Sequence, residues 1–248
     1  MQLLPHLLIA VLLLSILFLP GAALWIWLRR EQSGLLEALA ESAALSTSLY
    51  ALLGLLGYLA GLRFSPLAVI LFLFLSFISL VAGLVRQRNS LKFTRADALG
   101  LLLLALLAAW RYFQARNLAL PAWVDSVHHT LIVQKFLEAG SVPASLAPEV
   151  QAPFFYHYGF HAVTALFAGL SGLPAERAVL VLGQALNTLA ALAIYRLGRA
   201  FWPQGGKAAL AALLAGFALQ MPAYYLAWGR YTLLTGMVLL PVGIALAH

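Results

Sequence analysis

The polar side chains that could carry out chemistry lie in three short stretches of the sequence. The first stretch holds Asp125, His128 and His129. If a helix begins near Asp125, these side chains lie at positions i, i+3 and i+4 and share one helix face. A carboxylate beside imidazoles can act as a general base, and the same groups bind divalent metal ions. Asp125, His128 and His129 are therefore the candidate catalytic residues.

The second stretch runs from Tyr156 to His161 and adds two imidazoles. His157 and His161 are i, i+4 neighbours if this segment is helical. Together with Asp125 and His128 they form a candidate ligand set for a divalent metal ion. In the simpler interpretation, Asp125 only caps a helix and the histidine rings lie at the depth of the lipid headgroups.

The third stretch, Trp228–Thr232, contains Arg230 and Tyr231. A guanidinium group binds phosphate through paired hydrogen bonds, so Arg230 is a candidate contact for an anionic group. The alternative is an arginine that extends toward lipid headgroups. The candidate substrate-binding residues in the last two stretches are Tyr156, His157, His161, Arg230 and Tyr231.

The composition indicates that membrane-spanning helices position these three stretches. The chain has 248 residues, of which 63% are hydrophobic and 9% charged, whereas an ordinary globular domain is about 45–50% apolar and about 25% charged. Long apolar runs without alternation favour membrane-spanning helices over a β-barrel. The net charge of +7 lies mostly in short loops between apolar runs. There it sets orientation in the membrane and does not indicate nucleic-acid binding.

Seven apolar runs are candidates to cross a bilayer, for which a helix needs about 20 residues. We therefore expect an all-α polytopic transmembrane bundle with three spans in residues 1–95, followed by a core in residues 96–248. The expected spans are Pro5–Leu28, Ala43–Leu62, Pro66–Val85, Ala96–Phe113, Ala178–Leu197, Ala208–Leu226 and Leu233–Ala247.

Lysine and arginine predict the orientation through the positive-inside rule. Three basic clusters are expected on the cytoplasmic side. They comprise Arg29 and Arg30; Arg86, Arg88, Lys92 and Arg95; and Arg196, Arg199 and Lys207. Residues of about 114–176 then form one large extracytoplasmic loop, in which Pro143, Pro148 and Pro153 indicate irregular structure.

One apolar segment, Phe160–Leu173, lies within this loop. It is shorter than a span and is expected to form a juxtamembrane helix. Counting it as a span gives the competing arrangement of eight spans, which would place the cluster around Arg196 outside. Polar residues within the fifth expected span, Gln184 and Asn187, are expected to hydrogen-bond between helices.

The motifs resemble a known group of enzymes. A span, a large outer loop with Asp125 near its start, a proline-flanked aromatic stretch and a short juxtamembrane helix are similar to the front half of the GT-C superfamily of membrane glycosyltransferases. The strings around Asp125, Tyr156–His161 and Trp228–Thr232 resemble, more closely, a poorly characterised family of large prokaryotic membrane proteins placed near these enzymes. The resemblance covers about residues 96–248 and implies that the chain is the front part of a longer protein in a prokaryotic cell membrane.

The resemblance implies a donor with a polyprenyl-phosphate-linked sugar, and an acidic loop residue that deprotonates the acceptor or binds a metal ion. Asp125 is the matching position, a histidine beside it could share the base role, and Arg230 would contact the phosphate. The chain departs from the usual paired acids, because Asp125 is followed by Ser126 and two histidines. The sequence leaves the acceptor open.

Two other classes of function compete with this one. The same residues would suit a transporter or flippase that binds a lipid-linked saccharide without chemistry, although no inverted repeat supports it. A non-catalytic scaffold in a membrane complex is the third possibility. Soluble-enzyme fingerprints such as a phosphate-binding glycine loop or a Gly-x-Ser-x-Gly motif are missing from the sequence.

Overall fold

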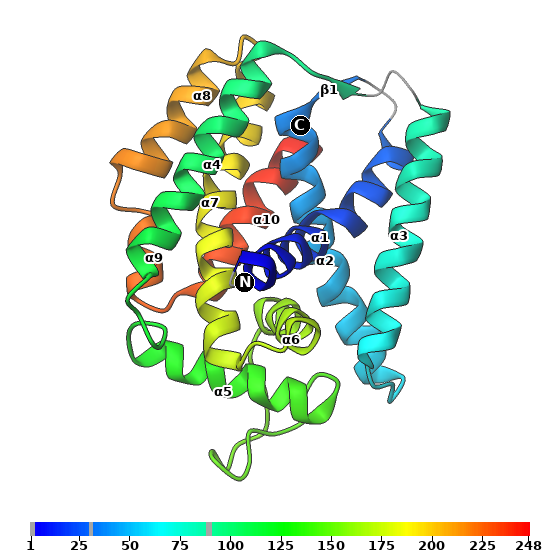
Figure 1. The fold of residues 1–248 in the computed structure, drawn as a ribbon, viewed down its shortest axis with the longest axis vertical. Coiled ribbons are helices and arrows are strands. Elements are labelled where there is room, and N and C mark those ends of the chain that lie inside the picture. Colours follow the sequence, from blue (N-terminus) through cyan, green and yellow to red (C-terminus); the bar gives the residue numbers. More distant parts are fainter. Residues whose placement is uncertain (1–2, 30–31, 88–90) are drawn as a thin grey trace.

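A computed structural model describes residues 3–29, 32–87 and 91–248 as a helical protein (Figure 1). Within these residues, the strands are the dipeptides β1 (Ser33–Gly34) and β2 (Leu91–Lys92), which pair in parallel. The helices of the first half are α1 (Leu3–Leu28), α2 (Leu35–Leu59), α3 (Pro66–Arg86), α4 (Arg95–Ala115) and α5 (Val124–Ala139). Those of the second half are α6 (Gly159–Ser171), α7 (Ala175–Phe201), α8 (Gly206–Leu213), the π-helix η1 (Leu214–Ala218), α9 (Ala223–Ala227) and α10 (Tyr231–Ala247). The predicted all-helical class is confirmed.

Local capping fixes where two of the long helices begin. The Ser65 hydroxyl accepts a hydrogen bond from the backbone N–H of Ala68, directly before Pro66 in the first turn of α3. At α4, Thr94 and Asp97 form a reciprocal capping box. The Asp97 carboxylate also accepts from the backbone N–H of Leu36, so the start of α4 is tied to the start of α2.

Helices α3, α4 and α7 run along the long axis of the molecule, whereas α1 runs obliquely to it and α5 and α6 cross it (Figure 1). In Figure 1, α3, α4 and α7 follow the long axis of the molecule, α5 lies across one end, and α6 is seen nearly along its own axis. The apolar segment that we expected beside the membrane therefore crosses the bundle as α6, with 13 residues. Its direction agrees with a juxtamembrane helix and not with an eighth span.

The core surrounds α7. The most apolar window of this helix is 78% buried, against 17% for α3 and α4. The large side chains on the outer faces of α3 and α4 are exposed and apolar, among them Phe74, Phe77 and Trp110. Such continuous apolar surface is suited to lipid and not to water. The buried hydrophobic cluster takes residues from α1 and α2 as well as from α7 and α10, so the first spans and the later core share one interior.

In the part of the chain that the structure describes, six helices are long and apolar enough to cross a membrane, which supports a membrane protein with several spans. They correspond to the first six expected spans. The seventh, α10, has 17 residues and is apolar but shorter. The total of seven spans therefore stays a prediction.

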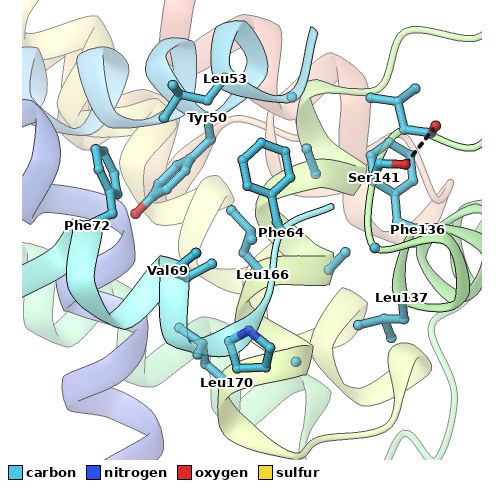
Figure 2. Close-up of a pocket in the computed structure, with 18 residues that line it drawn as sticks. Tyr50, Leu53, Phe64, Val69, Phe72, Phe136, Leu137, Ser141, Leu166 and Leu170 are labelled. Carbon is cyan, nitrogen blue, oxygen red and sulfur yellow. Dashed lines mark hydrogen bonds between the residues drawn. The ribbon is translucent and has the colours of Figure 1, made fainter. Parts of the chain in front are cut away.

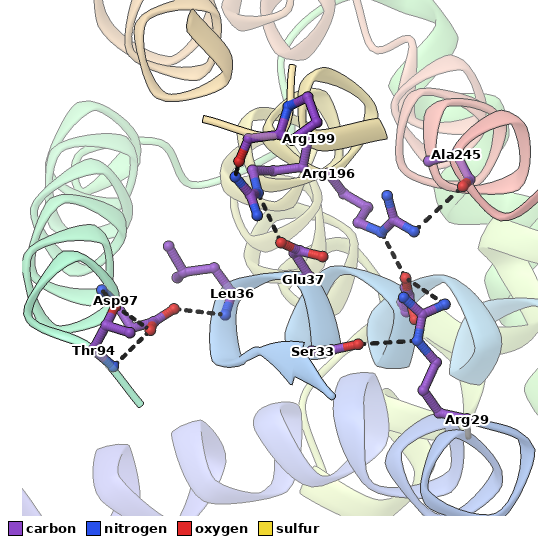
Figure 3. Close-up of polar contacts among 11 residues, drawn as sticks. Arg29, Ser33, Leu36, Glu37, Thr94, Asp97, Arg196, Arg199 and Ala245 are labelled. Atoms are coloured by element: carbon purple, nitrogen blue, oxygen red, sulfur yellow. Dashed lines mark hydrogen bonds and ion pairs between the residues drawn. The ribbon is translucent and has the colours of Figure 1, made fainter. Parts of the chain in front are cut away.

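A cluster of ion pairs gathers at the end of the bundle that carries β1 (Figure 3). The Arg196 guanidinium lies 2.5 Å from the buried Glu41 carboxylate, and that of Arg199 lies 2.8 Å from Glu37. Arg29 lies 3.7 Å from Glu41. The helix that carries both acids, α2, is thereby bound to α7.

The predicted basic clusters share this end of the molecule. Lys92 pairs with Gly34 in the small sheet, and Arg95 begins α4 beside it. Arg29, Arg196 and Arg199 lie in the ion-pair cluster described above. Arg30 and Arg88 lie outside the described residues. The grouping agrees with the predicted topology, and the assignment of this end to the cytoplasm stays a prediction.

Candidate functional site

Asp125 and Arg230 meet at the opposite end of the bundle. The Arg230 guanidinium lies 3.1 Å from the Asp125 carboxylate, and the two side chains are 49% and 35% exposed. Asp125 lies in the first turn of α5 and Arg230 directly precedes α10. Two stretches about a hundred residues apart in sequence therefore place opposite charges where a ligand can reach both.

The predicted helix cap at Asp125 is wrong. Helix α5 begins at Val124 and its N-cap is Trp123, which has a φ of 73° and forms no side-chain capping hydrogen bond. Because the helix starts earlier, the Asp125 carboxylate is free to pair with Arg230. An acidic residue in the first turn is still favourable for the helix dipole.

Gly229 allows the two helix starts to approach. It has a φ of 65°, and a Cβ atom at this position would lie 2.6 Å from Ser126 Oγ and 2.9 Å from Ser126 N. A larger residue would therefore push α5 away from α10. The Ser126 hydroxyl also donates to the Ala122 carbonyl oxygen.

A buried pair of histidines lies behind the exposed ion pair. His129 Nδ1 lies 2.8 Å from His161 Nε2, and both residues are buried. Burial lowers the pKa of His129 to about 4 and lowers the pKa of His161 well below its usual range. Two neutral imidazoles sharing one proton position bind α5 to α6, so His129 is better suited to positioning α5 than to contacting a substrate.

The aromatic residues of the site pack against one another in its wall. Tyr231 is 1% exposed, and its ring stacks on that of Phe160 at 5.2 Å. The His129 ring packs edge-on against Tyr231 at 5.6 Å. The start of α10 is thus anchored on α5 and α6, which fixes the backbone that presents Arg230.

The remaining candidates lie apart from the pair. His128 is exposed, whereas its neighbour His129 is buried. These two side chains therefore do not share one environment on a single helix face, as the spacing predicted. His157 precedes α6, because that helix begins at Gly159. The expectation of a helical i, i+4 pair with His161 is therefore wrong. Tyr156 is exposed and its ring stacks on His157 at 3.9 Å.

The predicted metal ligands do not converge. Within the described ranges, no group of three or more His, Asp or Glu side chains could hold a metal ion. His161 pairs with His129, and Asp125 pairs with Arg230. The four side chains named from the sequence therefore do not fit one ion in this geometry.

A cavity of about 390 Å³ lies near the ion pair, between α4, α7 and the segment around α9; we call it the polar cavity because six of its thirteen lining residues have polar side chains. Ala122 and Tyr231 form part of its wall, so it borders the starts of α5 and α10. Its polar lining residues are Arg111, Gln114, Gln184, Gln220, Tyr224 and Tyr231. Side-chain amides and a guanidinium are groups that bind sugar hydroxyls and phosphates.

A second cavity, of about 330 Å³, is apolar (Figure 2). It lies between α2, α3, α6 and the end of α5, and its walls include Phe64, Phe72, Leu166 and Leu170. Phe136 also lines it and stacks on His161 at a centroid distance of 6.5 Å. The two cavities share no lining residue, and the apolar one lies behind the histidine pair, away from Asp125.

A family model described as a family of unknown function, DUF6541, matches residues 14–248. The chain belongs to this family. No curated protein and no solved structure matches it. Because membership in DUF6541 names no activity, the functional argument for this chain rests on the geometry of its site.

The polar cavity of this DUF6541 chain was not predicted from its sequence. Arg111 and Gln114 close the fourth apolar run, where they are easily taken for the start of a loop. Gln184 was assigned to contacts between helices, and Asn187 beside it does donate to the Pro222 carbonyl oxygen at 3.0 Å. A useful signal was available, because charged and amide side chains at membrane depth are costly and usually functional.

Proposed function

We propose that the protein is an integral membrane glycosyltransferase of GT-C type. It would transfer a sugar from a polyprenyl-phosphate donor to an acceptor at the extracytoplasmic end of the bundle. The observation that supports this most strongly is the half-exposed Asp125–Arg230 pair. A carboxylate and a guanidinium side by side supply the base and the phosphate contact that this transfer requires.

The ion pair must open during the reaction. A donor phosphate that reaches Arg230 competes with Asp125 for the guanidinium, and its binding frees the carboxylate. Because the pair is exposed, its separation costs only about 0–1 kcal/mol. Donor binding would thereby prepare the base for the acceptor.

The transfer step then follows from these two side chains. The acceptor hydroxyl oxygen bonds to the anomeric carbon while the bond from that carbon to the phosphate oxygen breaks. The hydroxyl proton passes to the Asp125 carboxylate, and the polyprenyl phosphate leaves with its charge held by Arg230. No step is routed through a metal ion, since the four predicted ligands do not converge.

The neighbouring polar cavity supports a sugar substrate. Its glutamine side chains offer donors and acceptors to hydroxyl groups. The outer face of α4, one of the helices that border this cavity, is apolar, so a polyprenyl tail could remain in lipid while its phosphate lies at Arg230.

A transfer assay with a matched control tests the proposal. The full chain in proteoliposomes is given short-chain polyprenyl-phosphate sugars, and the initial rate of donor consumption is measured. Asp125→Asn should lower the rate by about 100- to 10,000-fold. Glu149→Gln changes another loop carboxylate that pairs with a base, Lys135, at 2.7 Å, and should leave the rate unchanged. Equal rates for wild type and Asp125→Asn would refute the proposal.

One observation favours a lipid-linked saccharide transporter as the second candidate. The sixth span is broken, because α8 passes into η1 and then into irregular backbone before α9. Broken spans that line a polar cavity are common in transporters. The two functions differ in their products, since a transporter moves the sugar lipid intact and a transferase releases polyprenyl phosphate.

A further inference from the structure

Arg111 is a buried cation without a counter-charge. It lies in the last turns of α4 and is 5% exposed. Within the described part of the chain it forms no ion pair, and none of the residues that line its cavity is acidic. A buried arginine with no anion beside it is costly, so its retention in an apolar span suggests a ligand.

The hydrogen bonds of Arg111 are incomplete. One terminal nitrogen donates to the Gly216 carbonyl oxygen and the other to Gln114 at 3.1 Å. The Nε atom is buried and has no hydrogen-bond partner. A guanidinium has five N–H donors, so with two neutral acceptors bound Arg111 keeps its full charge and three further donors, among them the Nε–H.

The sixth span is irregular where its backbone contacts the Arg111 side chain. Gly216 lies in the π-helix η1, which interrupts the span. A Cβ atom at Gly216 would lie 2.9 Å from Leu107 and 3.5 Å from Ala191, so the η1 backbone packs closely on α4 and α7. The irregular backbone after η1 carries Gln220, which lines the cavity, and irregular backbone at membrane depth is tolerated where it lines a cavity or is buried in protein.

We propose that the polar cavity around Arg111 binds a phosphate ester, with Arg111 as the charged contact and Gln184 and Gln220 as hydrogen-bonding neighbours. All three residues line the same cavity. This site is distinct from Arg230, and it concerns binding, so it holds whether the bound molecule is afterwards cleaved, transported or only retained. The phosphate could be carried by a lipid or be free in solution.

Binding of farnesyl phosphate to the full chain in detergent tests the proposal. Arg111→Gln should weaken binding by about 10- to 100-fold, the effect of losing a charged hydrogen bond. Arg116→Gln is the matched control, because Arg116 lies one turn further along the chain and is exposed. It should leave the affinity unchanged. Farnesol, which lacks the phosphate, should bind at least about 10-fold more weakly than farnesyl phosphate.

Competition with inorganic phosphate separates the two sources of the ligand. Displacement of farnesyl phosphate indicates that the free ion is recognised, and lack of displacement indicates a lipid-borne group. Equal affinity of wild type and folded Arg111→Gln for farnesyl phosphate would overturn the proposal, as would equal affinity for farnesol. If Arg111→Gln does not fold, Gln184→Leu replaces it, and an unchanged affinity in that variant overturns the proposal. A transfer assay that fails while this binding persists would reject only the proposed enzyme activity.

Discussion

The buried carboxylate of Glu41 offers the sharpest test of how the bundle is held together. Glu41 is 1% exposed. It accepts hydrogen bonds from Trp25 Nε1 at 2.7 Å and from Arg196 Nε at 2.5 Å. Replacing it by alanine leaves the buried Arg196 guanidinium with the Ala245 carbonyl oxygen as its remaining partner.

Removing one partner of a buried ion pair costs about 3–5 kcal/mol, because the other charge stays buried without compensation. One kcal/mol lowers Tm by about 2–4 °C in a chain of this size. We therefore expect Glu41→Ala to lower Tm by roughly 6–20 °C. The double variant Glu41→Leu with Arg196→Met removes both charges and should recover most of this loss.

Thermal unfolding of the purified chain in detergent measures both effects. Glu37→Ala is the control, since the Glu37–Arg199 pair is partly exposed, at 14% and 26%, and should cost only about 1 kcal/mol. A Tm for Glu41→Ala within about 2 °C of wild type would refute the reasoning. So would a double variant that is no more stable than the single one.

Other predictions concern the site itself. Because burial lowers the pKa of His129 to about 4, from about 6.5 when unfolded, the unfolded state binds more protons between these values. Stability contributed by His129 is thus complete above about pH 6.5 and falls by up to about 3 kcal/mol as pH drops toward 4, which Tm measured against pH should show; His129→Gln should make the profile shallower and leave the part due to His161, whose pKa burial also lowers. Gly229→Ala should lower Tm by an amount equivalent to about 1–3 kcal/mol through left-handed strain and contact with Ser126. Gly236→Ala, with open space around its Cβ position, should not lower Tm. Asn187→Ala should cost about 1–3 kcal/mol in thermal unfolding, because the buried Pro222 carbonyl oxygen loses its donor.

Much of the fold could be predicted from apolar run lengths. The first six expected spans coincide with helices that are long enough to cross a bilayer. The short segment after Gly159 differs from them in length, and counting it as a span would place the basic cluster around Arg196 outside. What composition could not give is the break in the sixth span, because residues 208–226 read as one continuous apolar run although the chain forms α8, η1 and α9 there.

The candidate site was predicted less completely. Helical spacing grouped Asp125 with His128 and His129, yet the pairs that form are long-range, Asp125 with Arg230 and His129 with His161. Periodicity within one helix cannot show which distant element packs on which face. The expected helical spacing of His157 and His161 fails for a related reason, since α6 begins two residues after His157.

The most direct test of the central proposal follows a polyprenyl-phosphate sugar in proteoliposomes that contain the wild type or Asp125→Asn. We predict that wild-type protein releases polyprenyl phosphate in proportion to the sugar transferred. Asp125→Asn should still bind the donor and release almost none. If the donor instead crosses the bilayer with its glycosyl–phosphate bond intact, at equal rates in both proteins, the glycosyltransferase proposal is contradicted and a transporter is indicated.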